Sequence, residues 1–210
     1  MSHYKDYGFV HDGATHMHKD IYAPLLKHLA PSKTSPVLDL GCGNGSIVRF
    51  LLAQDYDAYG TDASPKGIEI AEKLNPGRFA IQDLAADELP QHLKQIKFKT
   101  IISTEVIEHL YDPRTFIRFC KQILIENGGG SLILTTPYHG YLKNLMIALS
   151  GKWDRHADPL WDGGHIKLWS KHTLSQLVEE QGFKVIGFEG CGRVPYVWKS
   201  MMLIAEISHA

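Results

Sequence analysis

Several features typical of membrane and secreted proteins are missing from this 210-residue sequence. No apolar run approaches the roughly 20 residues that a membrane-spanning helix needs, and the first residues lack the apolar core of a signal peptide. The three cysteines, Cys42, Cys120 and Cys191, are odd in number and far apart. They predict reduced thiols rather than a disulfide framework. Together these absences predict a cytoplasmic protein.

An excess of charge of one sign is also missing. Lys and Arg number 22 and Asp and Glu 23, which gives a formal net charge of −1. No global field then draws the chain to a polyanion, so a nucleic-acid partner is disfavoured, although a local basic patch is not excluded. No repeat or low-complexity linker divides the sequence either. We therefore expect one domain over residues 1–210.

What is present is a regular alternation of short apolar runs and amphipathic stretches, typical of a parallel sheet covered by helices. The final two strands have no helix between them, so they should form an antiparallel hairpin. The alternation is interrupted only between Tyr138 and Ser170. We expect strands at Pro36–Leu40, Asp57–Thr61, Arg78–Gln82, Thr100–Ser103, Ser131–Thr135, Lys184–Glu189 and Met201–Ile207. We expect helices at Ile21–Leu29, Ser46–Gln54, Pro65–Leu74, Pro113–Glu126 and Lys171–Gln181.

A glycine-rich turn follows the first predicted strand. Gly41, Gly43 and Gly45 are spaced G-x-G-x-G, and glycine permits torsions and close ligand approach that a Cβ would obstruct. A dinucleotide fingerprint would have a third glycine where Ser46 and Ile47 stand. Asp39, just before the turn, would repel a pyrophosphate. The turn therefore favours a positively charged ligand.

Two further acids end the next two predicted strands. Asp62 lies 21 residues after Gly41, where a carboxylate can accept both hydroxyls of a ribose. Asp83 ends the third strand and can accept a proton from an adenine amino group, while Leu84 packs on the base. Open α/β sheets bind ligands at such strand ends. The series predicts a nucleoside site along this edge.

These segments carry a family resemblance. VLDLGCGNG, YGTDAS, IQDL and STEVIEHLYDP look like the conserved motifs of class I methyltransferases, close to the ubiquinone-biosynthetic O-methyltransferase group. The resemblance implies S-adenosylmethionine as cofactor and a Rossmann-like sheet of seven mostly parallel strands with a reversed last strand and helices on both faces. It implies that the cofactor-binding residues are Asp39, Gly41, Gly43, Asn44, Gly45, Asp62, Ala63, Asp83, Leu84 and Thr104.

The substrate half begins at Glu105, Glu108 and His109. On a helical turn, Glu105 would share a face with the other two. His109 could act as a general base with its ring oriented by a Glu, or all three could bind a divalent metal. The carboxylates could also shape the electrostatic environment of the cofactor. In the remaining interpretation the glutamates have no chemical role and only stabilise the N-terminus of a helix through its dipole.

A second likeness bears on the metal. E-V-I-E-H followed far downstream by His165, Trp169 and Ser170 is similar to small-RNA 2′-O-methyltransferases. That likeness implies Mg²⁺ or Mn²⁺ ligands at Glu105, Glu108, His109 and His165. The neutral chain without accessory RNA-binding domains does not support the RNA substrate.

We expect methyl transfer to a hydroxyl of a small or medium-sized acceptor. The reaction can proceed with a metal or without one, and the expected catalytic residues are His109 and Glu105. The alternatives are an N-methyltransferase, a nicotinamide-dependent dehydrogenase and a non-catalytic binding protein that keeps the fold. Relatives carry a substrate cap where this chain has residues 138–170, with a predicted helix at Tyr141–Leu149, and the ubiquinone-pathway enzymes touch membranes there. Transient membrane contact through residues 141–153 is one interpretation of this segment, and a packed lid helix is the other, which the length and charge of the segment favour. The N-terminal Tyr4, Tyr7 and Phe9 are expected to fold over the cofactor.

Overall fold

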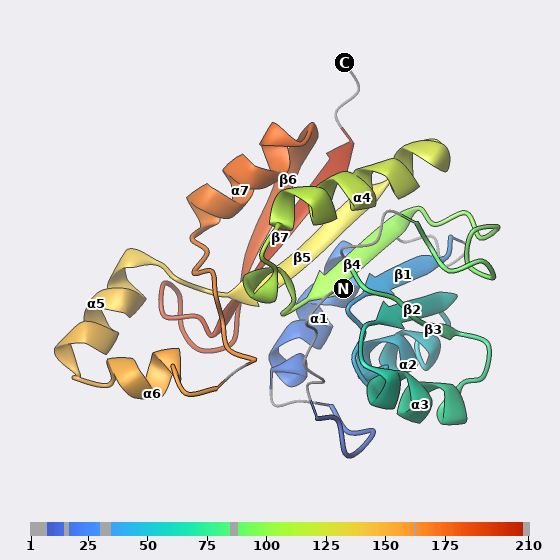
Figure 1. Ribbon diagram of the computed structural model, residues 1–210. Helices are drawn as coiled ribbons and strands as arrows, with labels where there is room; N and C mark the ends of the chain where they lie inside the picture. Colours follow the sequence, from blue (N-terminus) through green and yellow to red (C-terminus); the bar gives the residue numbers. More distant parts are fainter. Residues whose placement is uncertain (1–7, 15–16, 30–34, 85–87, 162, 208–210) are drawn as a thin grey trace.

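A computed structural model describes residues 8–14, 17–29, 35–84, 88–161 and 163–207. Its centre is one seven-stranded sheet in the order β3-β2-β1-β4-β5-β7-β6 (Figure 1). The strands are β1 (Val37–Leu40), β2 (Ala58–Asp62), β3 (Phe79–Ile81), β4 (Thr100–Thr104), β5 (Ser131–Pro137), β6 (Phe183–Cys191) and β7 (Ser200–Ile207). The helices are α1 (His18–His28), α2 (Ser46–Leu52), α3 (Pro65–Leu74), α4 (Pro113–Glu126), α5 (Tyr141–Leu149), α6 (Trp153–Ala157) and α7 (Lys171–Glu180), with a 3₁₀ turn η1 (Ile107–His109).

The strand directions confirm the expected Rossmann-like class. The pairs β3–β2, β2–β1, β1–β4 and β4–β5 are parallel, whereas β7 is antiparallel to both of its neighbours. The predicted terminal hairpin is therefore confirmed. Its second strand enters the sheet between β5 and β6, with Ser131 opposite Glu206 and Pro137 opposite Ser200. The carboxyl ends of β1, β2, β4 and β5 consequently lie at one edge.

Each face of the sheet has its own apolar core. On one face, Phe116 and Ile117 of α4 and Leu177 of α7 pack with Ile101 of β4. On the other, helices α1 and α2 pack with Ile102, the next residue of the same strand. Neighbouring strand residues point to opposite faces, so a buried parallel strand must be apolar at every position. This explains the unbroken apolar runs in the sequence.

Helix starts follow the local chemistry of the sequence. The Ser64 side chain accepts a hydrogen bond from the Gly67 N–H at 3.0 Å, and Pro65 takes the first position of α3. Asp112 caps α4 in the same way, accepting from the Thr115 N–H at 3.0 Å. These caps satisfy amides that have no partner within the helix, which is why both predicted starts are confirmed.

The interruption after β5 forms α5 and α6, which extend beyond the edge of the sheet (Figure 1). In α5 the usual burial pattern of a surface helix is reversed, because the one buried residue of this helix is the charged Lys143. Five large apolar side chains of α5 are exposed instead, namely Tyr141, Leu142, Leu145, Met146 and Leu149. Among the described residues, no helix combines the length and the hydropathy needed to cross a bilayer.

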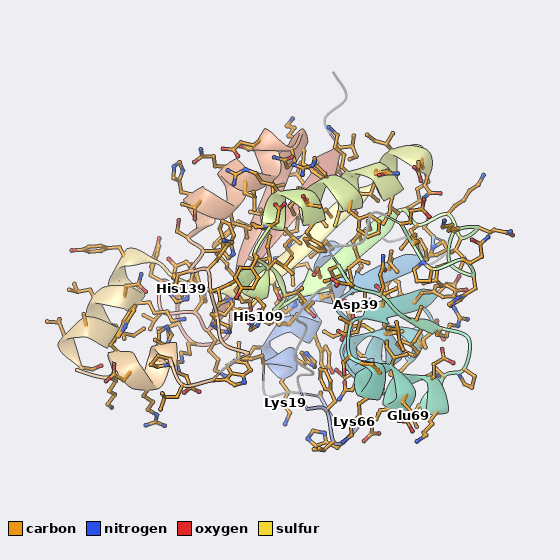
Figure 2. All side chains as sticks on the ribbon, in the orientation of Figure 1. Lys19, Asp39, Lys66, Glu69, His109 and His139 are labelled. Atoms are coloured by element: carbon orange, nitrogen blue, oxygen red, sulfur yellow. The ribbon has the colours of Figure 1, made fainter. Side chains whose placement is uncertain are left out.

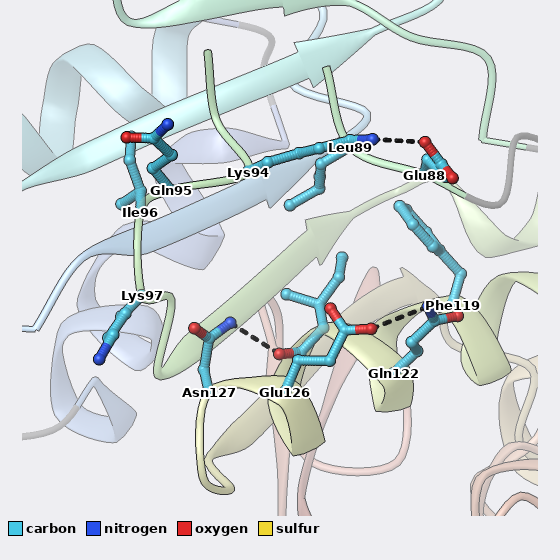
Figure 3. A pocket seen from close by; sticks show the side chains of 11 residues that line it. Glu88, Leu89, Lys94, Gln95, Ile96, Lys97, Phe119, Gln122, Glu126 and Asn127 are labelled. Carbon is cyan, nitrogen blue, oxygen red and sulfur yellow. Dashed lines mark hydrogen bonds and ion pairs between the residues drawn. The ribbon is translucent and has the colours of Figure 1, made fainter. Parts of the chain in front are cut away.

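A groove of about 530 Å³ lies at the edge of the sheet opposite to the carboxyl ends of the parallel strands. Its walls are the 88–97 segment, which leads into β4, and the C-terminal half of α4 (Figure 3). Both segments stand at the amino ends of β4 and β5. The groove is therefore remote from the strand ends that carry the predicted site residues.

Candidate active site

The glycine turn has the conformation that its composition predicts. Gly41, Gly43 and Gly45 have φ angles of +85°, +55° and +76°, in the left-handed region that residues with a Cβ rarely adopt. A Cβ on Gly41 would lie 2.4 Å from Cγ2 of Val106. The turn therefore requires glycine both for its torsions and for its close packing.

Asp62 faces this turn. Its Oδ2 accepts a hydrogen bond from the Gly43 N–H at 2.8 Å, and its Oδ1 accepts one from the Ser64 N–H at 2.7 Å. Both oxygens of this carboxylate are thus oriented by backbone N–H groups of the turn and of the residues after β2. Asp62 both anchors the glycine turn and lies at the end of β2 where the sequence predicted it.

Asp39 is buried at the end of β1, and within the described part of the chain neither of its carboxylate oxygens has a hydrogen-bond partner. Burial raises the pKa of this carboxyl to about 8, and the nearby charge of Asp62 adds to the rise. A buried carboxylate without partners is costly unless a cation or a donor compensates it. The carboxyl therefore suits a cationic ligand that carries an amino group.

The other predicted cofactor residues line the same strand ends. Ala63 follows β2 and is half-buried, Asp83 and the buried Leu84 follow β3, and the buried Thr104 ends β4. The Asn44 side chain is engaged differently, because its amide Nδ2 donates to the backbone oxygens of His11 at 2.8 Å and Gly13 at 3.0 Å. Asn44 thus holds the N-terminal segment.

That segment lies against the glycine turn. Cβ atoms built on Gly43 and Gly67 would approach the ring of Phe9 to 2.6 Å and 3.0 Å, and Arg49 donates to the backbone oxygen of Asp12. Phe9 therefore takes the place expected for an arm over the cofactor site. Tyr4 and Tyr7 lie outside the described residues.

Glu105 does not share a helical face with Glu108 and His109. It precedes the 3₁₀ turn and has a φ of +55°, so the face predicted from helical spacing is wrong. Its Oε1 accepts from the Thr135 hydroxyl at 2.9 Å and its Oε2 from the Ser200 hydroxyl at 3.0 Å. Burial raises the pKa of Glu105 to about 7.

Glu108, His109 and His165 do converge, with one ligand atom from each within 4.8 Å of the others. Oε1 of Glu108 lies 3.9 Å from Nε2 of His109 and 4.0 Å from Nε2 of His165. Among the described residues, this oxygen has no hydrogen-bond partner, while Oε2 accepts from the Thr136 hydroxyl at 2.9 Å. The structure brings together three of the four predicted metal ligands, with Glu105 outside this group.

The two histidines meet although 55 residues separate them in sequence. The backbone oxygen of Glu108 accepts hydrogen bonds from the N–H groups of Ile166 and Lys167, both at 3.0 Å. Nδ1 of His109 lies 3.2 Å from the Gly164 oxygen, a contact that orients Nε2 towards Glu108. Metal-binding histidines commonly have such a carbonyl partner.

The electrostatics of the group favour neutral imidazoles. Burial lowers the pKa of His109, and burial together with the charge of His109 lowers the pKa of His165 to about 4. Burial and the charge of Glu105 raise the pKa of Glu108. A divalent cation would reverse the cost of ionising Glu108, so one carboxylate and two neutral imidazoles fit Mg²⁺, Mn²⁺ or Zn²⁺.

Sequence reasoning missed Thr135, Thr136 and Ser200, whose hydroxyls hold the two glutamates. The signal for the threonines was their position at the carboxyl end of β5; Ser200 gave none, because it depends on where β7 enters the sheet. Trp161 flanks both histidines, with ring centroids 5.9 Å from His109 and 6.3 Å from His165, whereas Trp169 packs against the core.

Comparison with known proteins places these observations in a family. Residues 14–187 match the model of a methyltransferase domain. A ubiquinone biosynthesis O-methyltransferase of Cereibacter sphaeroides is 24% identical over 199 residues, which cover 93% of this chain and 76% of the relative.

Solved structures agree at the level of the fold. A methyltransferase in complex with the Haloferax volcanii Trm112 activator has a TM-score of 0.69 at 16% identity, covering 92% of this chain and 91% of its own. Magnesium protoporphyrin IX methyltransferase from Synechocystis, solved with S-adenosylhomocysteine, has a TM-score of 0.65 at 22% identity, covering 91% and 84%.

Proposed function

This chain belongs to the methyltransferase domain family and is an S-adenosylmethionine-dependent methyltransferase, and on that premise we propose that its acceptor atom is a hydroxyl oxygen. The observation that carries the proposal is the convergence of Glu108, His109 and His165 beside the end of β4. A cation held there would bind an acceptor hydroxyl and lower its pKa. The naming of the C. sphaeroides relative as an O-methyltransferase supports the same reaction.

The cofactor half is proposed to bind through the residues described above. The glycine turn permits close approach, Asp62 accepts hydrogen bonds from the ribose, and Asp83 with Leu84 holds the adenine. Asp39 faces the positively charged methionine portion. The bound cofactor supplies an electrophilic methyl group.

In the substrate half, the residues of this chain position the acceptor and handle its proton. Glu108, His109 and His165 are proposed to hold the cation, with Thr136 and Gly164 fixing their orientation. Glu105, held by Thr135 and Ser200, would accept the hydroxyl proton, and its pKa of about 7 suits that role. The rate enhancement would come from positioning rather than from a covalent intermediate.

Methyl transfer to a panel of phenols, catechols and sugars tests the proposal. We expect transfer to a hydroxyl that a chelator abolishes and Mn²⁺ or Mg²⁺ restores. Transfer to an amine, indifferent to chelator, would instead support the N-methyltransferase alternative. Transfer to oxygen that survives chelation would refute the role of a cation and leave Glu105 or His109 as the general base. The family match excludes the nicotinamide-dependent dehydrogenase.

We also propose transient membrane contact through residues 141–153. The exposed fractions of Tyr141 (83%), Leu149 (79%) and Trp153 (46%) are high for side chains of this size. Exposed apolar side chains on two successive helices, here α5 and α6, are typical of interaction surfaces. The contact would bring the cap, and with it the substrate half of the site, to a bilayer surface.

A further inference from the structure

The inward face of the cap carries positive charge. Lys143 is 5% exposed, and its Nζ donates to the backbone oxygen of Lys199 at 3.1 Å. An ammonium has three donors, so this bond leaves two that the described residues do not satisfy. Burial and the charge of Arg193, in the β6–β7 loop, lower the pKa of Lys143 to about 8. A lysine is seldom buried in this way without a partner.

Two histidines lie beside this lysine. His139 is 7% exposed, and among the described residues neither of its ring nitrogens makes a well-formed hydrogen bond. Its ring centroid lies 5.4 Å from that of His156, on α6. The charges of Lys143 and Arg193 both act on His156. Three elements, α5, α6 and the β6–β7 loop, therefore direct basic side chains to one place.

These basic groups have little carboxylate compensation. No ion pair within the described residues joins Lys143 or Arg193 to an acid. The charge of Glu105 acts on Lys143, but no direct ion pair joins these two side chains among the described residues. An anion from outside the chain would satisfy donors that the fold leaves open.

The basic groups also adjoin the substrate half of the site. The charges of His156 and Lys143 both act on His165, one of the three converging residues. In the view of Figure 2, the label of His109 stands between those of His139 and Asp39. An acceptor whose hydroxyl lies at His109 and His165 would extend towards Lys143.

We propose that Lys143, Arg193, His139 and His156 form a subsite for an anionic group of the methyl acceptor, a carboxylate or a phosphate. This inference rests on the proposed function, because it assigns the far end of the molecule whose hydroxyl is methylated. The anion would accept hydrogen bonds from Lys143 Nζ and from the imidazoles. The acceptor class is then an anionic hydroxy compound.

Equilibrium binding to the protein saturated with S-adenosylhomocysteine and Mn²⁺ tests the subsite independently of turnover. The probes share a catechol ring: 3,4-dihydroxybenzoate, 3,4-dihydroxyphenylphosphonate, the uncharged methyl 3,4-dihydroxybenzoate and the cationic 3,4-dihydroxybenzylamine. We expect both anions to bind about tenfold or more tightly than the ester, since a hydrogen bond to a charged group contributes about that factor. Whichever anion binds more tightly identifies carboxylate or phosphate as the natural group.

Variants locate the preference. Lys143→Gln and Arg193→Gln should each remove most of the preference for the anionic probes over the ester, whereas Arg193→Lys should retain this preference. Lys152→Gln, an exposed lysine of the same cap, is the matched control and should have no effect. Arg193 is exposed, so its variants remain informative even if Lys143→Gln fails to fold.

Equal affinity for the anions and the ester, or no binding of either anion at millimolar concentration, would overturn the subsite. So would a loss in Lys152→Gln as large as that in Arg193→Gln. An anion preference without any methyl transfer to oxygen would keep the subsite and refute the proposed acceptor atom. Methyl transfer to oxygen without a preference for anions would refute the subsite and keep the proposed acceptor atom.

Discussion

Asp39→Asn should stabilise the protein without cofactor and weaken cofactor binding. The folded chain holds a proton on Asp39 up to a pKa of about 8, whereas the ordinary value for an aspartate is 3.8. Between these values the folded state binds more protons than the unfolded state, so this residue makes stability fall as pH rises. Asparagine keeps the shape of the side chain and removes the charge.

The size of this stability change follows from the pH range between the two pKa values of Asp39. One pKa unit corresponds to about 1.4 kcal/mol, so the slope between about pH 4 and pH 8 is at most about 1.4 kcal/mol per pH unit. The true slope is smaller, because the effective dielectric constant inside a folded protein is well above that of dry protein. We expect the advantage of Asp39→Asn over wild type in free energy of unfolding to grow by about 2 kcal/mol from pH 5 to pH 8.

Urea unfolding at pH 5, 6, 7 and 8 measures this advantage, and calorimetry with S-adenosylhomocysteine measures the second effect. We expect affinity to fall more than tenfold, because the ligand's ammonium loses a carboxylate partner. Asp154→Asn, on the exposed α6, is the control. Parallel stability profiles for wild type and Asp39→Asn, or unchanged affinity, would refute the reasoning.

Three further predictions concern the remaining parts of the site and the cap. Asp62→Ala should weaken S-adenosylhomocysteine binding more than tenfold in calorimetry, because the proposed ribose acceptor and the hydrogen bond to Gly43 are both lost. His109→Ala should abolish turnover and weaken Mn²⁺ binding, while cofactor affinity stays nearly unchanged. Leu145→Gln with Leu149→Gln should reduce co-sedimentation with phospholipid vesicles at least twofold, since buried apolar area drives such contact.

Each of these has an outcome that contradicts it. Retained micromolar cofactor binding in Asp62→Ala would remove its ribose role, and a joint loss of turnover and cofactor affinity in His109→Ala would make that residue structural. For the vesicles, Ile125→Gln is the control, because Ile125 is 52% exposed on α4, away from the cap. An equal reduction by Ile125→Gln would show that the cap has no special affinity for lipid.

The glycine turn and the acids at the strand ends were predictable because each of these parts is local. A buried strand, a glycine turn and a capped helix follow one another in sequence, and Asp62 and Asp83 each end a strand whose apolar run is visible. Parallel strands then bring these ends to one edge without further information. The hairpin was predictable for the same reason, since no helix separates β6 from β7.

The substrate half depended on contacts that spacing does not encode. Glu105 departs from the helical face because its backbone is left-handed, held by β5 and β7, and Ser200 reaches it only because β7 enters between β5 and β6. His165 joins His109 through backbone hydrogen bonds of the cap.

The sequence by itself therefore determined the fold class and the placement of glycines and acids at the strand ends, since both arise from periodicity and from turns within single strand–helix units. The tertiary structure alone decided which acids and imidazoles meet, and that the lysine of α5 turns inward while its leucines face outward. Those outcomes depend on the register of the sheet and on the path of the cap. Both are set by packing between segments far apart in the chain.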